Sequence, residues 1–418
     1  MRVLHLLHRS VPGTHGYAIR SREIVTKQRD MGMEPIVVTS PSQAPLGRLD
    51  AEGSEYIDGI RYFRACGTLL DPTMEVHDKS PLRSSLRVLQ NARLFTAAMR
   101  VASTYKPDIV HGHSPFTCGI VADLVGRIKN VPSVYEMRGI WEDSHTVRYG
   151  LSDKSLRYRG VRFLETLALK GARACCVICD LLKSEVVSRG IPEDKVLVVP
   201  NGVDIAAFPP GEPDRELRNV LGLHDRLVVG YIGSFFRYEG LELLLKAISE
   251  LAGALPELGL LLVGDGETAS ELKQMASRVG IDDRTVFAGR LPHSRVIDYY
   301  RLCDIMVLPR RDARETRLVT PLKPLEIMAA GRPLVASDIG GHREIVEDGM
   351  NGILFRAEDL EDLKTKIVAL VRDPALRIDL GRRARQWVEA HRDWRQIVES
   401  YRVLYEDLLQ GRDKSSFL

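Results

Sequence analysis

The residues with the clearest chemical potential lie in the run PRRDARETRLVTPLKPLEIMAAG, residues 309–331. A buried strand is expected over residues 304–308 and a helix from about Pro324, so a basic loop leads into a helix start. Backbone N–H groups at a helix start bind anions, and guanidinium and ammonium groups add donors suited to phosphate. The cations available in this stretch are Arg310, Arg311, Arg314, Arg317 and Lys323.

Glu326 falls in the first turn of the same expected helix. An ionised carboxylate only accepts hydrogen bonds, and two neighbouring sugar hydroxyls offer two donors to it. A phosphate on the cations and a diol on Glu326 would together describe a bound nucleotide. The alternative is an ordinary strand-to-helix connection with a solvated basic loop, and this stretch alone does not separate the two.

Polar groups also follow two expected strands in the first half of the chain. His113 lies in HGHSP (residues 111–115), and Glu136 and Arg138 lie in EMRGIWED (residues 136–143). The turn PGTHG, residues 12–16, follows the first expected strand, and its glycines let a ligand approach the backbone. Because parallel strands end at one edge of a sheet, we expect these groups to converge on one crevice. For His113 alone, packing or surface exposure is the alternative.

The elements that must position these groups alternate along the whole chain. Strands are expected at residues 3–7, 35–40, 60–64, 108–111, 133–136, 174–179, 196–199, 227–232, 259–263, 285–288, 304–308 and 333–337. Amphipathic runs predict helices at residues 82–105, 119–129, 156–169, 181–189, 241–250, 270–279, 360–371, 376–390 and 394–409. Alternation of this kind predicts an α/β protein with parallel sheets covered on both faces.

A turn and linker, NGVD followed by AAFPPGEPD, interrupts the alternation after residue 200. A chain of 418 residues also exceeds one ordinary core. We therefore expect two doubly wound halves, a first domain over residues 1–202 and a second over 203–390, with the strand-end loops of both facing one cleft.

The charge of the chain is unevenly distributed. Residues 1–200 hold 28 Lys+Arg and 21 Asp+Glu, a net of +7, whereas residues 201–418 hold 31 and 35, a net of −4. A basic first half suggests an anionic partner, such as a phosphorylated lipid, a membrane surface or a polyanion, although an ordinary soluble surface is the alternative. The arginine-flanked helix at residues 82–105 has two interpretations, a membrane-surface helix or, favoured here, a core-packed helix.

No run of the sequence reaches the roughly 20 apolar residues of a spanning helix, and the run VLHLL is too short for a signal peptide. A cytoplasmic location is expected, with membrane association left open. The Cys176-x-x-Cys179 spacing has no second Cys/His pair at ligand spacing, so we expect small buried residues rather than a metal or redox site.

Taken together, several motifs resemble one protein family. These are PGTHGY, PDIVHGH, VPNGVD, YIG, LLLVGDGE, FAGRLP, DIMVLP and KPLEIMAAGRPLVASDIGGHREIVEDGMNGILF, in this order and spacing. The chain is similar over nearly its whole length to the retaining glycosyltransferases of family four, the group one glycosyltransferases. That resemblance implies the GT-B fold of two Rossmann-like domains facing a cleft. It also implies that residues 391–418 form a helix crossing back onto the first domain.

The resemblance also implies roles for individual residues. The first domain would hold the acceptor, near Gly13, His15, Gly16, Glu136 and Arg138. The second domain would hold a nucleotide-diphosphate sugar, with Glu326 on the ribose; His113 and Glu326 are the expected catalytic residues. The expected donor-binding residues are Gly233, Arg237, Arg310, Arg311, Thr320, Leu322, Lys323 and Glu326. No metal and no other cofactor is expected, because cationic groups would stabilise the departing diphosphate.

Two family positions are changed in this chain. The Glu-x7-Glu motif places Leu318 where the first glutamate should be, and Ser234 and Glu239 replace the Arg and Lys of the phosphate loop G-R-x-x-x-x-K-G. We expect Arg237, Arg310, Arg311 and Lys323 to replace the lost charge.

Three functions remain open on the sequence. The favoured one is a metal-independent hexosyl- or related glycosyltransferase (EC 2.4) acting on a glycan or lipid-linked acceptor in polysaccharide or glycolipid synthesis. The others are a nucleotide-sugar-binding protein without turnover and a nucleotide-sugar epimerase. Nothing in the pattern indicates a nucleic-acid partner, and the donor base, donor sugar and acceptor are not readable.

Overall fold

The computed structural model describes residues 1–13, 15–65, 81–143 and 154–411, with the backbone alone for residues 81–90. The chain divides into two compact units. Unit 1 comprises Met1–Pro200 and Trp394–Leu418, and unit 2 comprises Asn201–Asp393. The first boundary falls two residues before the expected one, and the C-terminal segment clusters with unit 1.

The described strands of unit 1 form one sheet in the order β3-β4-β2-β1-β5-β6-β7-β8, parallel except for the β3–β4 pair. Its strands are β1 (Arg2–Leu7), β2 (Glu34–Thr39), β3 (Ser54–Ile57), β4 (Ile60–Arg64), β5 (Ile109–His113), β6 (Ser133–Met137), β7 (Ala174–Val177) and β8 (Val196–Val198). Its helices are α1 (Gly16–Asp30), α2 (Pro81–Tyr105), α3 (Phe116–Lys129), α5 (Leu156–Gly171), α6 (Asp180–Ser188) and α16 (Trp394–Leu409), with a 3-10 turn η1 (Glu193–Lys195). The chain runs from β1 outward to β2–β4, then returns to β5 on the other side, so the topological switch lies between β1 and β5.

Helix α2 had two interpretations from its sequence, a membrane-surface helix or a core-packed helix. Leu94, Ala98, Val101 and Ala102 are buried in the core against β2 and β5 residues. Over residues 91–105 the helix is therefore core-packed, as favoured. The side chains of Arg83, Leu86, Arg87 and Leu89 lie outside the described residues.

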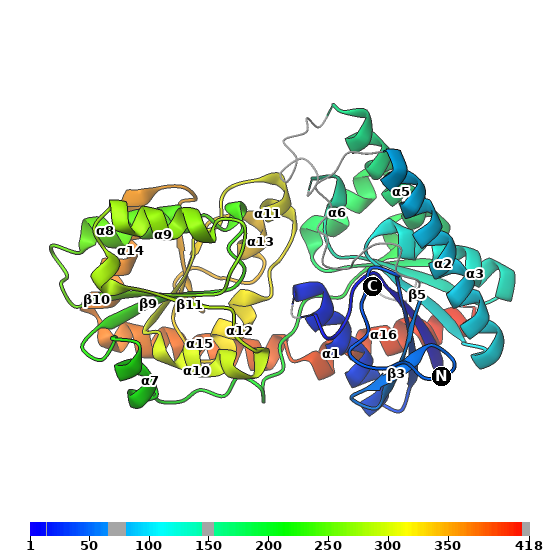
Figure 1. Ribbon diagram of the computed structural model, residues 1–418, viewed down its shortest axis with the longest axis horizontal. Helices are drawn as coiled ribbons and strands as arrows, with labels where there is room; N and C mark the ends of the chain where they lie inside the picture. The colour runs from blue at the N-terminus through cyan, green and yellow to red at the C-terminus, as the bar shows by residue number, and fades with distance from the viewer. Residues whose placement is uncertain (14, 66–80, 144–153, 412–418) are drawn as a thin grey trace. The chain divides into compact units, whose positions relative to one another are not determined.

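Unit 2 is a second sheet of parallel strands, in the order β11-β10-β9-β12-β13-β14. Its strands are β9 (Leu227–Ile232), β10 (Leu258–Val263), β11 (Thr285–Gly289), β12 (Ile305–Leu308), β13 (Leu334–Ser337) and β14 (Ile353–Phe355). Its helices are α7 (Arg215–Val220), α8 (Leu241–Leu251), α9 (Ala269–Arg278), α10 (Val296–Leu302), α11 (Arg314–Leu318), α12 (Lys323–Ala329), α13 (Gly340–Arg343), α14 (Leu360–Arg372) and α15 (Pro374–His391). The 3-10 turns are η2 (Arg237–Glu239), η3 (Asp282–Arg284) and η4 (His293–Arg295). Helices α8, α9 and α14 cover one face of this sheet and α10, α12 and α15 the other (Figure 1). The expected α/β architecture of two doubly wound sheets is confirmed.

Helix α16 belongs to unit 1 although it follows unit 2 in the chain. It packs against α1 and buries Trp394, Ile397, Val398, Tyr401, Leu404 and Tyr405. The chain enters and leaves unit 2 side by side, because the N–H of Val203 donates to the carbonyl of Arg392 at 2.9 Å. No helix within the described residues is both long and apolar enough to cross a membrane.

Candidate functional site

The candidate donor site of unit 2 lies where β9 and β12 run side by side. The chain turns from β9 to β10 and β11 on one side and later places β12, β13 and β14 on the other. Open parallel sheets bind ligands at the carboxyl ends of the strands at such a switch point. Gly233 follows β9 and Arg310 follows β12, and Lys323 begins α12.

Glu239 joins two of the predicted phosphate-binding cations. Arg310 donates from Nε and Nη2 to the two Glu239 carboxylate oxygens at 3.2 and 3.0 Å, and Lys323 donates from Nζ at 2.5 Å. Glu239 is fully buried; burial opposes its ionisation, but Arg310 and Lys323 outweigh it and lower its pKa to about 2. The acid at the family's lysine position therefore holds two cations that come from elsewhere in the chain.

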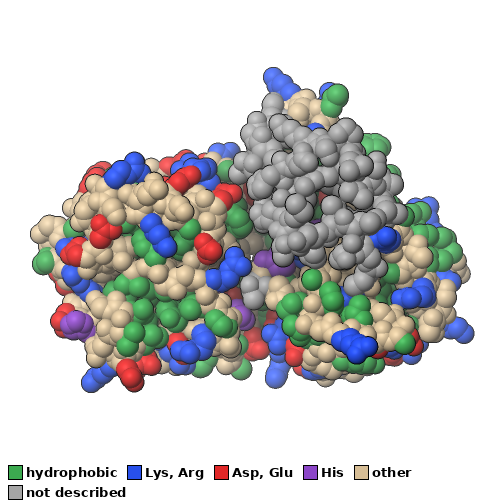
Figure 2. Space-filling model, in the orientation of Figure 1, with side chains coloured by type: hydrophobic (Ala, Val, Ile, Leu, Met, Phe, Trp, Pro, Cys, Tyr) green, Lys and Arg blue, Asp and Glu red, His purple; other side chains and the backbone are tan. Residues whose placement is uncertain are grey.

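The other predicted cations of this region pair at the surface of unit 2. Arg237 contacts Glu271 at 3.1 Å and Arg311 contacts Glu242 at 3.3 Å, whereas Arg317 pairs with Asp312. Acidic and basic side chains are interspersed over the visible face of this unit (Figure 2). The structure thus brings Arg310 and Lys323 together and places Arg237 and Arg311 in separate, exposed ion pairs.

Glu326 lies in the first turn of α12, as expected, and its environment is more apolar than expected. The Tyr300 hydroxyl donates to its Oε2 at 2.9 Å, and burial raises the pKa of Glu326 above its ordinary value. Helix α12 is short, with seven residues, and burial is the largest influence on the pKa of Glu326. His293 and Tyr300 partly offset that burial.

The remaining predicted donor residues are placed around these groups. Thr320 is buried, and its carbonyl accepts from the Asn201 side chain at 2.9 Å. Leu322 is the residue before α12, and Leu318, at the changed motif position, ends α11. The stretch expected to be a plain loop thus contains a one-turn helix of its own.

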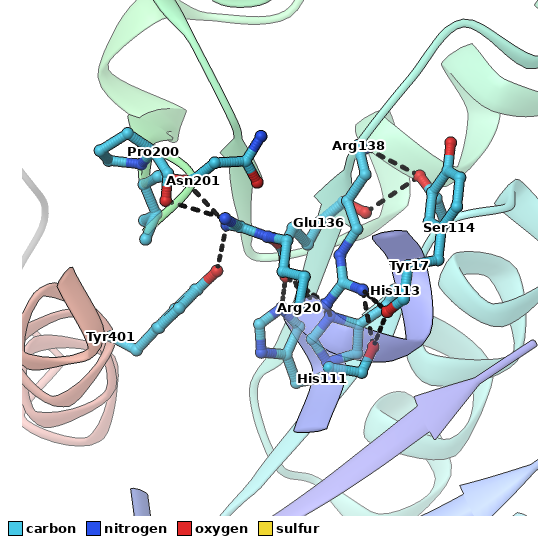
Figure 3. A network of polar contacts seen from close by, with 12 residues as sticks. Tyr17, Arg20, His111, His113, Ser114, Glu136, Arg138, Pro200, Asn201 and Tyr401 are labelled. Atoms are coloured by element: carbon cyan, nitrogen blue, oxygen red, sulfur yellow. Dashed lines mark hydrogen bonds and ion pairs between the residues drawn. The ribbon is translucent and has the colours of Figure 1, made fainter. Parts of the chain in front are cut away.

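In unit 1 the predicted group is brought together inside the unit. His113 Nδ1 lies 2.7 Å from Glu136 Oε2, and Arg138 contacts the same oxygen at 3.1 Å (Figure 3). His113 is the last residue of β5 and only 1% exposed, so placing it in a loop after the strand was wrong; its hydrogen bonds satisfy it within the sheet. Burial raises the pKa of Glu136, but the neighbouring Arg138 and Arg20 outweigh this effect and hold that pKa well below its usual value.

Arg20 completes this group and ties distant elements together. It donates to Glu136 at 2.8 Å, to the carbonyls of Val199 and Pro200 at 2.8 Å, and to the Tyr401 hydroxyl at 2.9 Å (Figure 3). Neither Arg20 nor Tyr401 was among the sequence candidates. The sequence held one indication of this role, because polar residues lie among apolar ones on one side of the helix. Arg20 and Gln28 are buried together with Ala18, Ile24 and Val25 of α1.

Three buried histidines, His5, His111 and His113, lie close enough to hold a metal ion together. Their nitrogens are mostly engaged: His5 bonds His113 at 2.9 Å and Gln28 at 2.7 Å, and His111 bonds Tyr405 at 2.6 Å. The rings of His111 and His113 are stacked at 4.0 Å, so their in-plane lone pairs do not converge on one point. A hydrogen-bonded network therefore describes this cluster better than a metal site.

The predicted loop after β1 precedes α1. Gly13 and Gly16 are partly or fully exposed, and Thr14 lies outside the described residues. His15 is the N-cap residue of α1, and its buried Nε2 has no hydrogen-bond partner among the described residues. Burial lowers the pKa of His15 to about 4, so its ring is neutral near pH 7.

Comparison with known proteins places this chain in a family. Residues 15–202 match the model of the glycosyl transferase 4-like domain, and residues 213–387 match that of the glycosyl transferases group 1. A D-inositol 3-phosphate glycosyltransferase from Catenulispora acidiphila is 29% identical over 328 residues, 76% of each chain.

Solved structures agree in fold. Sucrose-phosphate synthase from Thermosynechococcus elongatus aligns with a TM-score of 0.78 at 20% identity, covering 98% of this chain and 100% of that one. An Anabaena protein in complex with UDP-glucose aligns with a TM-score of 0.72 at 21% identity, covering 97% and 100%. The fold is GT-B, with two Rossmann-like domains. The chain belongs to the group 1 glycosyltransferases, as the motifs indicated.

Proposed function

We propose that this glycosyltransferase moves a hexose or related sugar from a nucleotide-diphosphate sugar to a glycan or lipid-linked acceptor, with retention of anomeric configuration. The observation that carries the proposal is the pair formed by Arg310 and Lys323 at the switch point of unit 2. A leaving diphosphate develops negative charge, and cations fixed at that position stabilise it. The structure of the UDP-glucose complex in a protein of the same fold supports a nucleotide sugar as donor.

Nine of the predicted residues have a role in this proposal. Arg310 and Lys323 bind the diphosphate, and Glu326 accepts from the ribose hydroxyls. In unit 1, His113, Glu136 and Arg138 support the acceptor side, near Gly13, His15 and Gly16. Because two side-chain cations serve the diphosphate, we propose that the reaction needs no metal ion.

The test is turnover with a panel of UDP-, GDP- and ADP-sugars. Release of one nucleoside diphosphate, undiminished by EDTA, is the expected result, and Arg310→Ala or Lys323→Ala should reduce it by about tenfold or more. NMR of the anomeric proton would report the configuration of the product. Tight nucleotide-sugar binding with neither transfer nor hydrolysis would favour a binding protein, and proton exchange at the sugar C2 would favour an epimerase.

We also propose an anionic acceptor at a membrane surface, in polysaccharide or glycolipid synthesis. The first half of the chain carries the net positive charge. Within unit 1, Leu156, Phe163 and Leu167 are exposed at helical spacing on α5, and Leu124 and Ile128 are exposed on the contacting helix α3. Exposed cations flank this apolar strip, among them Arg159 and Lys170. Apolar side chains bordered by cations are typical of surfaces that bind anionic lipid.

Vesicle sedimentation tests this second part. The full chain should bind vesicles containing phosphatidylglycerol more tightly than neutral vesicles, and the difference should shrink as salt rises. Phe163→Ser should weaken binding, whereas Tyr56→Ser, at an exposed aromatic side chain elsewhere in unit 1, serves as the control. Equal binding to both kinds of vesicle would favour a soluble acceptor.

A further inference from the structure

Glu239 uses only part of the donor capacity of its two partners. Arg310 gives Nε and one N–H of Nη2 to the carboxylate, and its Nη1 has no hydrogen bond to a described residue. Lys323 gives one of its three N–H groups to Glu239, and the described residues accept no other. The two side chains keep 10% and 18% of their exposure. Both cations therefore keep donors that no described residue uses, on side chains that are partly exposed.

The surrounding backbone is shaped around these cations. Gly233 has φ +153°, and a Cβ there would lie 2.0 Å from Lys323 Cε, so only glycine leaves room for the lysine. Gly240 has φ +68°, and a Cβ there would lie 2.1 Å from the Pro309 carbonyl oxygen. The Arg311 N–H also donates to the Tyr238 carbonyl at 2.9 Å. The segment carrying Glu239 and the segment carrying Arg310 are thus held together by close backbone contacts.

Aromatic rings limit where the cations can turn. The Arg310 guanidinium lies 5.5 Å from the centre of the Tyr238 ring, and the Lys323 ammonium lies 5.3 Å from that of Tyr231. Long cationic side chains lose conformational entropy when a ligand fixes them. Cations already fixed by a carboxylate and an aromatic ring have lost that entropy before the ligand arrives.

We propose that Glu239 is a positioning residue that fixes Arg310 and Lys323 as a pair for the diphosphate of the nucleotide sugar. This inference rests on the function proposed above. Glu239 stands where the family has the lysine of its phosphate loop. Arg310 and Lys323 would replace the positive charge that this loop has lost, and Glu239 would orient them. Glu239 itself does not touch the ligand, and it acts through its two partners.

The test compares diphosphate with nucleoside binding. Calorimetry would measure the affinities of the full chain and of its Glu239→Gln variant for UDP, GDP and ADP and for the matching nucleosides. The ratio of diphosphate to nucleoside affinity should fall about tenfold in Glu239→Gln, because one well-placed charged hydrogen bond is worth about that factor. Glu250→Gln is the matched control, since Glu250 pairs with Lys364 on the outside of unit 2.

A double-mutant cycle separates positioning from a general structural role. In a Lys323→Met background, Glu239→Gln should lower the ratio less than it does alone, because one of its two partners is already gone. Gly233→Ala provides a second route, since it displaces Lys323 and leaves Glu239 intact, and it should lower the same ratio. It remains informative if Glu239→Gln does not fold.

The contrary results are distinct. An unchanged ratio in folded Glu239→Gln would show that Glu239 only stabilises the fold, and additive effects in the cycle would show that Glu239 does not act through Lys323. A higher ratio would show that the carboxylate merely competes with the anion. Each of these three results would overturn the positioning role, while the proposed function would stand. Failure of the parent chain to bind any of the three diphosphates would refute the proposed function and this role with it.

Discussion

Single carboxylates organise the polar groups of both units. Glu136 holds Arg20 and Arg138 in unit 1, and Glu239 holds Arg310 and Lys323 in unit 2. Burying an ion is costly, and the cost is offset only when its partners are close and well hydrogen-bonded. Each carboxylate has two cations, so each cluster keeps one net positive charge. In the Glu239 cluster, where the cations keep part of their exposure, that residual charge agrees with the diphosphate site proposed above.

Glu326 gives the first prediction at this scale. Glu326→Gln should weaken nucleoside and nucleoside diphosphate by the same factor, about tenfold, because both ligands carry the ribose. Calorimetry with uridine and UDP, or the pair of bases that binds, checks this. Glu361→Gln, at an exposed glutamate, is the control. Loss of diphosphate affinity alone would move Glu326 from the ribose to the phosphates.

The buried histidines give the second prediction at the scale of single residues. Burial lowers the pKa of His5 to about 3 and of His113 to about 4, whereas an unfolded histidine titrates near 6.5. Below about pH 6.5 the unfolded chain therefore binds protons that the folded chain does not, so stability falls as pH falls. Each histidine contributes up to about 1.4 kcal/mol per pH unit.

Urea unfolding at about pH 7 and about pH 5.5 measures this slope. His5→Gln should remove about one proton's share of it, because glutamine does not titrate. A free energy of unfolding that is the same at both pH values would contradict the neutral, buried state of this cluster.

At the scale of elements, apolar runs and amphipathic spacing predicted most strands and helices within a few residues. The strands of residues 60–64 and 227–232 and the helix of residues 394–409 were predicted with the bounds found. The strands β3 and β14 were missed, because they have only four and three residues. Cys175, Cys176 and Cys179 are buried, as expected.

The site was harder to predict than the elements. The stretches carrying His113, Glu136 and Lys323 stood out, because strand ends and basic loops are visible in sequence. The role of Glu239 could not be predicted, since its partners lie 71 and 84 residues away in the sequence. Only the order of the strands in the folded sheet brings them close to it. Surface pairing of Arg237 and Arg311 likewise depends on which acids the fold brings beside them.

Arg20 gives a prediction for the elements that it joins. Arg20→Ala should cost about 3–5 kcal/mol of stability, because a buried carboxylate loses one partner and α16 loses an anchor. Arg22→Ala is the matched control on the same helix, since Arg22 pairs with Asp58 at the surface and should cost under about 1 kcal/mol. Chemical denaturation of both variants measures the difference. Equal costs would mean that the Arg20 bonds contribute little.

At the scale of the whole molecule, unit 1 is completed by a helix from the far end of the chain. The six buried side chains of α16 contribute about 1.5–3 kcal/mol each. Their sum is comparable to the whole stability of a domain, about 5–15 kcal/mol. Unit 2 has its own continuous core.

Truncation tests this division. A chain ending at Asp393 should leave unit 1 unfolded, whereas residues 201–393 alone should show a cooperative thermal transition. Circular dichroism and hydrogen exchange distinguish the two. Native-like protection of β1 and β5 in the chain without α16 would contradict the prediction.

The late position of α16 also sets an order of events during synthesis. Trp394 is added 194 residues after Pro200 (394 − 200), which at about 5–20 residues per second takes on the order of 10–40 s. Throughout that interval the nascent first unit lacks the helix that covers α1 and binds Arg20 and His111. Unit 2 emerges and can fold in the meantime. Unit 1 is therefore begun before unit 2 and finished after it, and its uncovered apolar face is a natural substrate for chaperones until α16 is made.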